Sequence, residues 1–177
     1  MAASAGAQFK AKVALVERED RLGGDCLHYG CVPSKSLIHA SRVAHEVAHS
    51  SEVGVHAQLE TIDFQAALSH VHRVIDTIQV HDSTERFESL GVEVIYGKGE
   101  FTDSRTFAVN DRTLKARSFI IATGSRPASP SIEGLEAAGY ITNLTVFSLQ
   151  LTKQKYARNE RLQGGLSRVF GVLRSWG

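Results

Sequence analysis

Two short apolar runs restrict this chain to the α/β class more than any other feature of its sequence. Lys12–Glu17 (KVALVE) and Ser118–Ala122 (SFIIA) lack the alternation that marks a strand with one face in water. Such runs are typical of strands buried on both faces of a parallel sheet. Between them, apolar residues recur at helical spacing over Pro33–Ser50 and again after Asp63, a candidate N-cap. The pattern predicts an α/β domain.

Turn and capping signals predict the smaller elements. The second helix has a stripe of six apolar residues: Ala67, Leu68, Val71, Val74, Ile75 and Ile78. Asp82 or Ser83 begins a short helical continuation, which Gly91 ends as a C′ glycine. Strands are expected over residues 92–96, 106–109 and 117–122. The turn pairs Asp103-Ser104 and Asn110-Asp111 separate them and indicate a small antiparallel element.

Charge is unevenly distributed along the chain. The net charge is +1, but residues 151–177 hold six basic side chains and one acidic one, which leaves −4 for residues 1–150. The main body therefore lacks the basic surface expected of a nucleic-acid-binding protein. No segment approaches the roughly 20 apolar residues of a membrane span, and no signal peptide is recognisable. With only two cysteines, we expect a cytoplasmic protein without a disulfide scaffold.

The two cysteines lie in the most informative stretch, residues 23–35 (GGDCLHYGCVPSK). Cys26 and Cys31 are five positions apart, so on an ideal helix their Cα atoms would exceed the roughly 7 Å limit for a disulfide. A bridge requires a distorted first turn, which Gly30 and Pro33 permit. Two unconnected thiols and a zinc half-site are the alternatives. Zinc needs four ligands, and no second ligand pair matches.

The position of each cysteine suggests different chemistry. If the helix begins near Pro33, Cys31 lies at its N-terminus, where backbone N–H groups stabilise a thiolate. Lys35 adds a positive charge one turn later. Cys26 is then the better candidate for the exposed thiol that meets a substrate.

Residues 23–35 resemble the active-site pattern GGxCxxxGCxPSK of the class I pyridine nucleotide-disulfide oxidoreductases, with every fixed position present. This family includes mercuric reductases, dihydrolipoamide dehydrogenases and glutathione reductases. The resemblance runs from about Gln8 to Leu149. It implies part of an FAD-binding Rossmann-like domain: a parallel sheet with helices plus a small antiparallel β element. Asp25, His28 and Tyr29 favour the mercuric-reductase-like branch.

The resemblance also implies a mechanism. Electrons pass from NAD(P)H through FAD to the Cys26–Cys31 disulfide, and on to a disulfide, dithiol or metal-ion substrate. Cys31 is then the thiolate in charge-transfer contact with the flavin, and Cys26 is the interchange thiol. Lys35 lies near the flavin N5 and tunes its electronics.

Cofactor-binding roles follow from three matching segments. Lys12–Glu17 resembles the strand whose terminal acid binds the adenosine ribose, Val92–Phe101 the strand whose backbone meets the adenine, and Ser118–Pro127 the ATG motif near the flavin. The implied FAD-binding residues are Glu17, Gly23, Gly24, Asp25, Cys26, Cys31, Lys35, Gly97, Gly99, Ala122, Thr123 and Gly124.

Other family features do not match this sequence. The opening G-x-G-x-x-G loop, the NAD(P)H domain and the dimerisation domain of the homodimeric family have no counterpart. We therefore expect a fragment truncated at both ends, with a partial FAD domain over residues 1–150 and a basic tail unlike the family over 151–177. The alternative to an oxidoreductase is a non-catalytic remnant, or a flavin-binding or interaction module without turnover.

The tail and the histidines offer weaker signals. Within 151–177, apolar residues share one face of a possible basic amphipathic helix, which three glycines weaken by about 1 kcal/mol each. A membrane role is therefore not favoured. His45 and His49 have i,i+4 spacing, but no third ligand accompanies them in sequence. A solvated helix face is the preferred interpretation, and no metal site is predicted.

Overall fold

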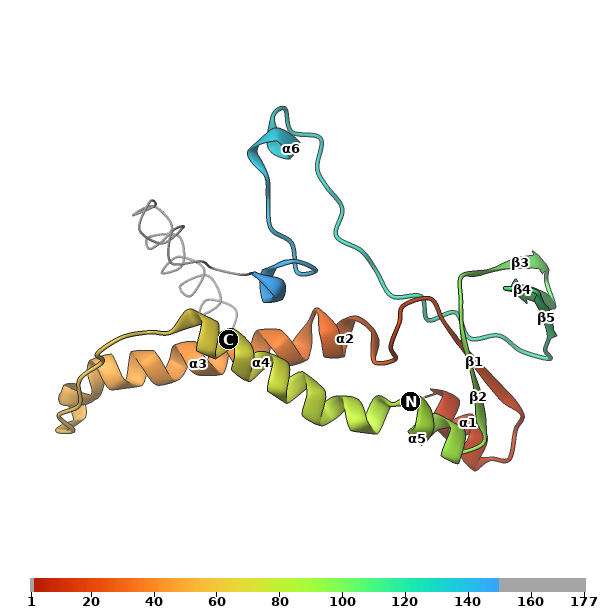
Figure 1. The fold of residues 1–177 in the computed structure, drawn as a ribbon, viewed down its shortest axis with the longest axis horizontal. Helices are drawn as coiled ribbons and strands as arrows, with labels where there is room; N and C mark the ends of the chain where they lie inside the picture. The colour runs from red at the N-terminus through yellow and green to blue at the C-terminus, as the bar shows by residue number, and fades with distance from the viewer. Residues whose placement is uncertain (1, 150–177) are drawn as a thin grey trace. The chain divides into compact units, whose positions relative to one another are not determined.

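The computed structural model describes residues 2–149. Within this range the chain forms two compact units, one from residues 2–25 with 77–126 and the other from residues 26–76 with 127–149. Figure 1 shows the order of helices and strands along the chain. The predicted amphipathic helix over 151–177 lies outside the described residues. Within residues 2–149, no helix combines the length and apolar character needed to cross a membrane.

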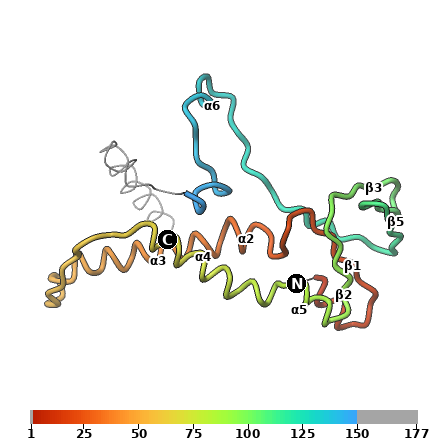
Figure 2. The backbone as a smooth tube through the Cα atoms, viewed as in Figure 1, coloured from red at the N-terminus to blue at the C-terminus, as the bar shows by residue number. Residues whose placement is uncertain are grey.

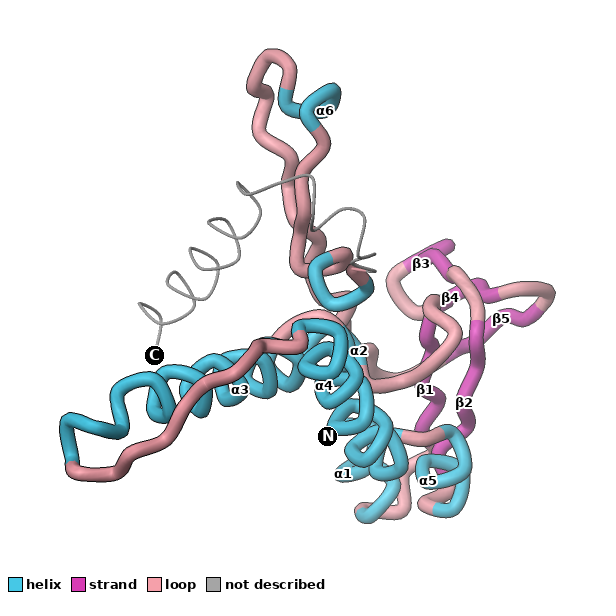
Figure 3. The backbone as a smooth tube through the Cα atoms, turned by 60° about the vertical axis from the view of Figure 1, so that its left-hand side comes forward, coloured by secondary structure: helices cyan, strands magenta, loops and turns pink. Residues whose placement is uncertain are grey.

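The first unit contains a parallel pair of strands. β1 (Val13–Glu17) pairs with β2 (Val92–Tyr96) in a register that places Val13 opposite Val92 and Glu17 opposite Tyr96. The two strands lie side by side in Figure 3. This confirms the prediction of a parallel sheet built on the first apolar run. Among the described residues β2 is the only partner of β1, which is why β1 is half-buried rather than enclosed on both faces.

Two short helices accompany this strand pair. α1 (Ala2–Gln8) packs on β1 so closely that a Cβ on Gly6 would lie 2.9 Å from the Val13 side chain. α5 (Thr84–Ser89) contributes Phe87 to a core cluster with Leu22 and Val92. These apolar contacts hold the helices on the sheet, and their burial is the main stabilising term.

The predicted boundaries of α5 are confirmed. The Ser83 hydroxyl oxygen accepts a hydrogen bond from the backbone N–H of Arg86 at 3.2 Å, as an N-cap does. After the helix, Gly91 has a φ of 82°, in the left-handed region that favours glycine. β2 begins at the next residue, Val92.

The first unit also contains a three-stranded antiparallel sheet in the order β3-β4-β5. Its strands are β3 (Gly99–Asp103), β4 (Thr106–Val109) and β5 (Arg112–Lys115). The predicted turns connect them: the Asp103 carboxylate accepts from the Arg105 N–H at 2.8 Å, and Asn110 has a φ of 52°. The third predicted strand, 117–122, is not one of them.

The prediction of a buried strand over residues 117–122 is wrong for the described part of the chain. The segment forms no strand, and Ile120 and Ile121 are 75% and 73% exposed. A strand exists only where a neighbour supplies ladder hydrogen bonds, and no described strand pairs with this segment. Only Phe119 packs, against the rings of Phe101 and Phe107. Figure 3 shows the segment as loop after β5.

The second unit is mainly helical. α2 (Gly24–His28) leads into it, and α3 (Cys31–His49) follows after Tyr29 and Gly30. α3 therefore begins two residues before the predicted start at Pro33. The long course of α3 and then α4 (Phe64–Gln79) is easily followed in Figure 2. The smaller elements of the described chain are the 3-10 helices η1 (Ser50–Val53), η2 (Val80–Asp82) and η3 (Val146–Ser148), and α6 (Leu135–Ala138).

The predicted cap and core stripe of α4 are confirmed. The Asp63 carboxylate accepts from the Ala66 N–H at 2.9 Å. Leu68, Val71 and Ile75 are buried, as predicted, together with Phe64, which the stripe did not include. The solvent-facing side of α4 also contacts a segment far away in the sequence. A ring nitrogen of His72 lies 3.0 Å from the carbonyl oxygen of Phe147.

Candidate functional site

The first candidate site lies where β1 and β2 end together. Because the pair is parallel, Glu17 and Tyr96 stand opposite each other at the carboxyl edge of the sheet. The backbone N–H of Gly97 donates to the carbonyl oxygen of Glu17 at 2.8 Å, which continues the ladder one step past the last strand pair. Ligands of parallel α/β sheets bind beyond this edge. The structure therefore brings together Glu17 and Gly97, two residues predicted from distant parts of the sequence.

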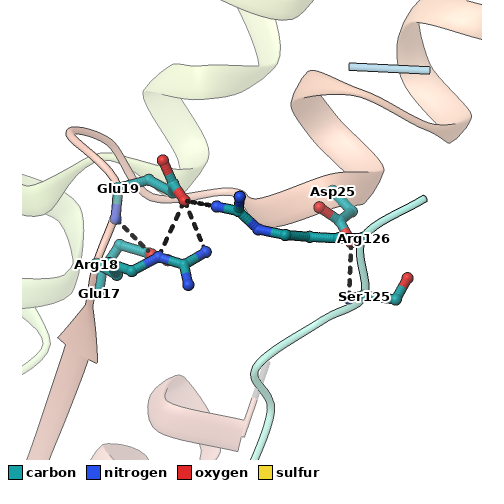
Figure 4. A network of polar contacts seen from close by, with 6 residues as sticks. All are labelled: Glu17, Arg18, Glu19, Asp25, Ser125 and Arg126. Atoms are coloured by element: carbon teal, nitrogen blue, oxygen red, sulfur yellow. Dashed lines mark hydrogen bonds and ion pairs between the residues drawn. The ribbon is translucent and has the colours of Figure 1, made fainter. Parts of the chain in front are cut away.

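Polar contacts order the loop that leaves β1. A carboxylate oxygen of Glu17 accepts from the backbone N–H of Glu19 at 2.9 Å. The Glu19 carboxylate in turn receives the guanidinium groups of Arg18 at 2.8 Å and Arg126 at 3.3 Å (Figure 4). The hydrogen bond from Arg18 is the largest cause that lowers the pKa of Glu19, and the charge of Arg126 acts in the same direction. Glu19 thus links the loop after β1 to the segment 122–126.

Asp25 makes the second link to that segment. Its carboxylate accepts from the backbone N–H of Ser125 at 3.2 Å (Figure 4). Gly124 has a φ of 67°, and a Cβ at Gly124 would lie 3.0 Å from an Asp25 oxygen. Gly23 and Gly24 also have positive φ, at 118° and 62°, where the chain turns into α2. Asp25 and Gly124, two of the predicted cofactor residues, therefore lie next to each other, and Gly23 and Gly24 form the turn before Asp25.

The remaining members of the ATG motif are exposed. Ala122 and Thr123 lie in the extended segment before Gly124. Their backbone is in no described strand. Its N–H and C=O groups therefore have no ladder partners and are available to a ligand.

Asn110 is a residue of this edge that the sequence analysis noted only as a turn former. Its side-chain amide donates to the carbonyl oxygen of Tyr96 at 3.0 Å. A Cβ on Gly97 would overlap the same amide, so the glycine is required for Asn110 to lie there. The available signal was an asparagine in a tight turn, where it tolerates positive φ and bonds to backbone.

Gly99 has a different role from Gly97 in the structure. A Cβ at Gly99 would overlap the ring of Phe107 and lie 2.6 Å from the carbonyl oxygen of Ala108. Gly99 pairs with Val109 in the β3–β4 ladder. The missing side chain is therefore explained by packing within the antiparallel sheet, independently of any ligand.

The second candidate site is the cysteine pair. Cys26 lies on α2, Cys31 is the first residue of α3, and both are exposed free thiols in the structure. Gly30 between them has φ −129° and ψ −110°, outside the helical region. This break is the distorted turn that a bridge between Cys26 and Cys31 was predicted to require. It brings the two sulfur-bearing side chains into contact.

The contact is reflected in the acidity of Cys26. A hydrogen bond with the Cys31 side chain is the largest cause that raises the pKa of Cys26, and desolvation adds to it. The positive charge of Lys35 acts the other way and lowers that pKa in part. Cys26, Cys31 and Lys35 thus interact with one another, and the catalytic roles predicted for them stay a prediction.

The start of α3 is also ordered locally. The Ser34 N–H donates to the carbonyl oxygen of Gly30 at 3.1 Å, and the Ser34 hydroxyl donates to that of Cys31 at 3.3 Å. Pro33 and Leu37 are buried on the same first turns. Cys31 is therefore held at the amino end of a helix whose opposite face is fixed in the core.

Comparison with known proteins gives a consistent result. The family described as pyridine nucleotide-disulphide oxidoreductase matches residues 1–162. A mercuric reductase of Lysinibacillus sphaericus is 30% identical over 143 residues, covering 81% of this chain and 26% of that protein. A dihydrolipoyl dehydrogenase of Acholeplasma laidlawii is 34% identical over 174 residues, covering 97% of this chain and 50% of that protein. The chain thus spans a quarter to a half of the length of these two relatives.

The fold also matches a solved structure. The Cu(II) complex of the HOCl-induced flavoprotein disulfide reductase RclA from Escherichia coli superposes with a TM-score of 0.68, at 22% identity. The match covers 84% of this chain and 31% of that one. The division predicted at residue 150 stays a prediction.

Proposed function

The chain belongs to the pyridine nucleotide-disulphide oxidoreductase family, and from this premise we propose that it acts as the disulfide-bearing part of an FAD-dependent oxidoreductase. Electrons from NAD(P)H pass through FAD to the Cys26–Cys31 disulfide and on to a substrate. The observation that carries the proposal is the contact between the two exposed thiols. An ideal helix would forbid this contact, and the break at Gly30 permits it.

The thiol chemistry follows from this arrangement. A two-electron reduction of the disulfide yields two thiols and takes up two protons. The Cys26 thiolate attacks a sulfur of the substrate disulfide, and one substrate thiolate leaves. The Cys31 thiolate then attacks Cys26, re-forms the disulfide and releases the second substrate thiolate. The hydrogen bond between the two side chains, which raises the pKa of Cys26, supports this second step.

The residues at the sheet edge fit the adenosine end of FAD. Glu17 presents a carboxylate at the end of a parallel strand, which is a ribose-binding position. Gly97 carries no side chain, and the Asn110 side-chain amide lies in the space that one would occupy. When bound, FAD supplies hydride acceptance from NAD(P)H and two-electron transfer to the disulfide. The chain's own residues bind and orient the cofactor, and Cys26 and Cys31 hold the protons.

For the substrate we propose a disulfide, a dithiol or a metal ion. Relatives are named for mercuric ion and for the dihydrolipoyl group. A pair of adjacent exposed thiols suits both a small disulfide and a soft metal ion, which thiolate ligands prefer.

A second candidate function is a flavin-binding or interaction module without turnover. The chain spans 26% of the mercuric reductase and 31% of the solved flavoprotein that it matches, so the activity of those whole proteins stays a proposal for this chain. The two candidates differ in turnover, not in flavin binding.

The test is to express residues 1–177, add excess FAD, desalt and record the flavin spectrum before and after reduction. We expect bound flavin with a long-wavelength charge-transfer band on reduction. Cys31→Ser should abolish this band, while Cys26→Ser should retain it. A colourless protein, or a band that survives Cys31→Ser, would overturn the assignment. Bound flavin with NADH or NADPH consumption and disulfide reduction selects the enzyme over the module.

A further inference from the structure

The far end of α3 carries two histidines that the thiol chemistry does not use. His45 and His49 are one helical turn apart, and both are exposed. Their ring centroids lie 4.0 Å apart with an interplanar angle of 42°. Two imidazole nitrogens bound to one metal ion, each at about 2.0–2.1 Å, lie roughly 3 Å from each other. Such chelation separates the two ring centroids by roughly 4.5–5 Å, so the rings must move apart by less than about 1 Å to bind one ion.

A backbone contact fixes the form of one ring. The Nδ1 atom of His49 lies 2.8 Å from the carbonyl oxygen of His45. Because a carbonyl oxygen only accepts, the ring must donate an Nδ1–H, and the neutral ring then carries its lone pair on Nε2. Metal-binding histidines are oriented in this way, with the second ring nitrogen bonded to a carbonyl or carboxylate.

The electrostatic surroundings favour a cation. His49 is the last residue of α3, where the partial negative charge of the helix C-terminus stabilises positive charge. The sequence around the pair holds the acids Glu46 and Glu52 and one base, Arg42. This end of the helix therefore has a net negative formal charge when the histidines are neutral.

From this juxtaposition we propose that His45 and His49 form a binding site for a borderline divalent transition-metal ion, of the class of Ni²⁺, Zn²⁺ and Cu²⁺, which imidazole ligands suit. Among residues 2–149, no group of three or more His, Cys, Asp or Glu side chains meets to hold an ion. The protein therefore supplies two ligands and water completes the coordination. A site with open positions exchanges its ion, unlike a closed structural site.

The test is isothermal titration of the untagged 177-residue chain with Ni²⁺. We expect the wild-type protein to bind Ni²⁺ at His45 and His49 in addition to any binding by the Cys26 and Cys31 thiols. The second imidazole on the same helix binds intramolecularly, so His45→Ala and His49→Ala should each weaken binding by about a hundredfold. His39→Ala is the matched control, because it removes an exposed histidine from the same helix at a different position.

A second measurement distinguishes Ni²⁺ bound by the cysteine thiolates from Ni²⁺ bound by the histidines. The same titration of the Cys26→Ser/Cys31→Ser double variant should keep the site unchanged. Absence of binding in the wild type, survival of full affinity in either His45→Ala or His49→Ala, or loss of the site in the double cysteine variant would each overturn the proposal. None of these outcomes depends on flavin binding, so the proposed function is tested separately.

Discussion

Substitution of Gly99 by alanine tests whether this glycine serves packing or a ligand. The added Cβ would overlap the Phe107 ring and lie 2.6 Å from the Ala108 carbonyl oxygen, whereas unstrained heavy-atom contacts are about 3.5–4.0 Å. The oxygen belongs to the β4 backbone, so the β3–β4 ladder must open by about 1 Å to admit the methyl group. We expect destabilisation of about 3 kcal/mol, at the upper end of the usual range for overpacking.

Gly91→Ala is the matched control. Gly91 has a φ of 82°, and an added Cβ would meet nothing within 4 Å, so only backbone strain acts. That strain costs about 1–2 kcal/mol and is offset by about 0.4–1 kcal/mol of lost unfolded-state entropy, which leaves about 1 kcal/mol. The same chemical change should thus differ by about 2 kcal/mol between the two positions.

Urea unfolding followed by circular dichroism measures the difference. With an m-value of about 2 kcal/mol/M, the midpoint of Gly99→Ala should fall about 1 M below that of Gly91→Ala. Equal midpoints for the two variants would refute the packing argument. A native-like midpoint in Gly99→Ala combined with lost FAD affinity would assign this glycine to the cofactor instead.

Two further predictions concern α4 and the cysteine pair. Asp63→Ala removes the N-cap acceptor of the Ala66 N–H and should destabilise the chain by about 1 kcal/mol, measured in the same unfolding assay; an unchanged midpoint would contradict the capping role. The contact with Cys31 raises the pKa of Cys26, so Cys26 should reach half-maximal alkylation by iodoacetamide at a higher pH than an ordinary thiol. Cys31→Ala removes the cause and should shift that pH–rate profile to lower pH, whereas an unshifted profile would show that the two side chains do not interact.

Much of the fold could be predicted because its signals are local. The caps at Asp63 and Ser83, the C′ glycine Gly91 and the turn at Asn110 each act within a few residues. Local hydrogen bonds and φ preferences depend on residue type alone, so sequence patterns report them directly. The cysteine motif was equally clear, since a bridge between residues at this spacing requires a distorted turn, and the structure has a helix break at Gly30.

The sequence by itself predicted which residues carry chemistry and determined which helices and turns present them; the tertiary structure decided their neighbours. Sequence could not show that Asn110 binds the Tyr96 carbonyl, that Phe107 excludes a side chain at Gly99, or that Asp25 holds Ser125. Nor could it show that residues 117–122 lack a described strand partner and stay exposed. The physical reason is that contacts and strand pairing join residues distant in sequence, and an apolar run specifies the need for burial but not the partner that provides it.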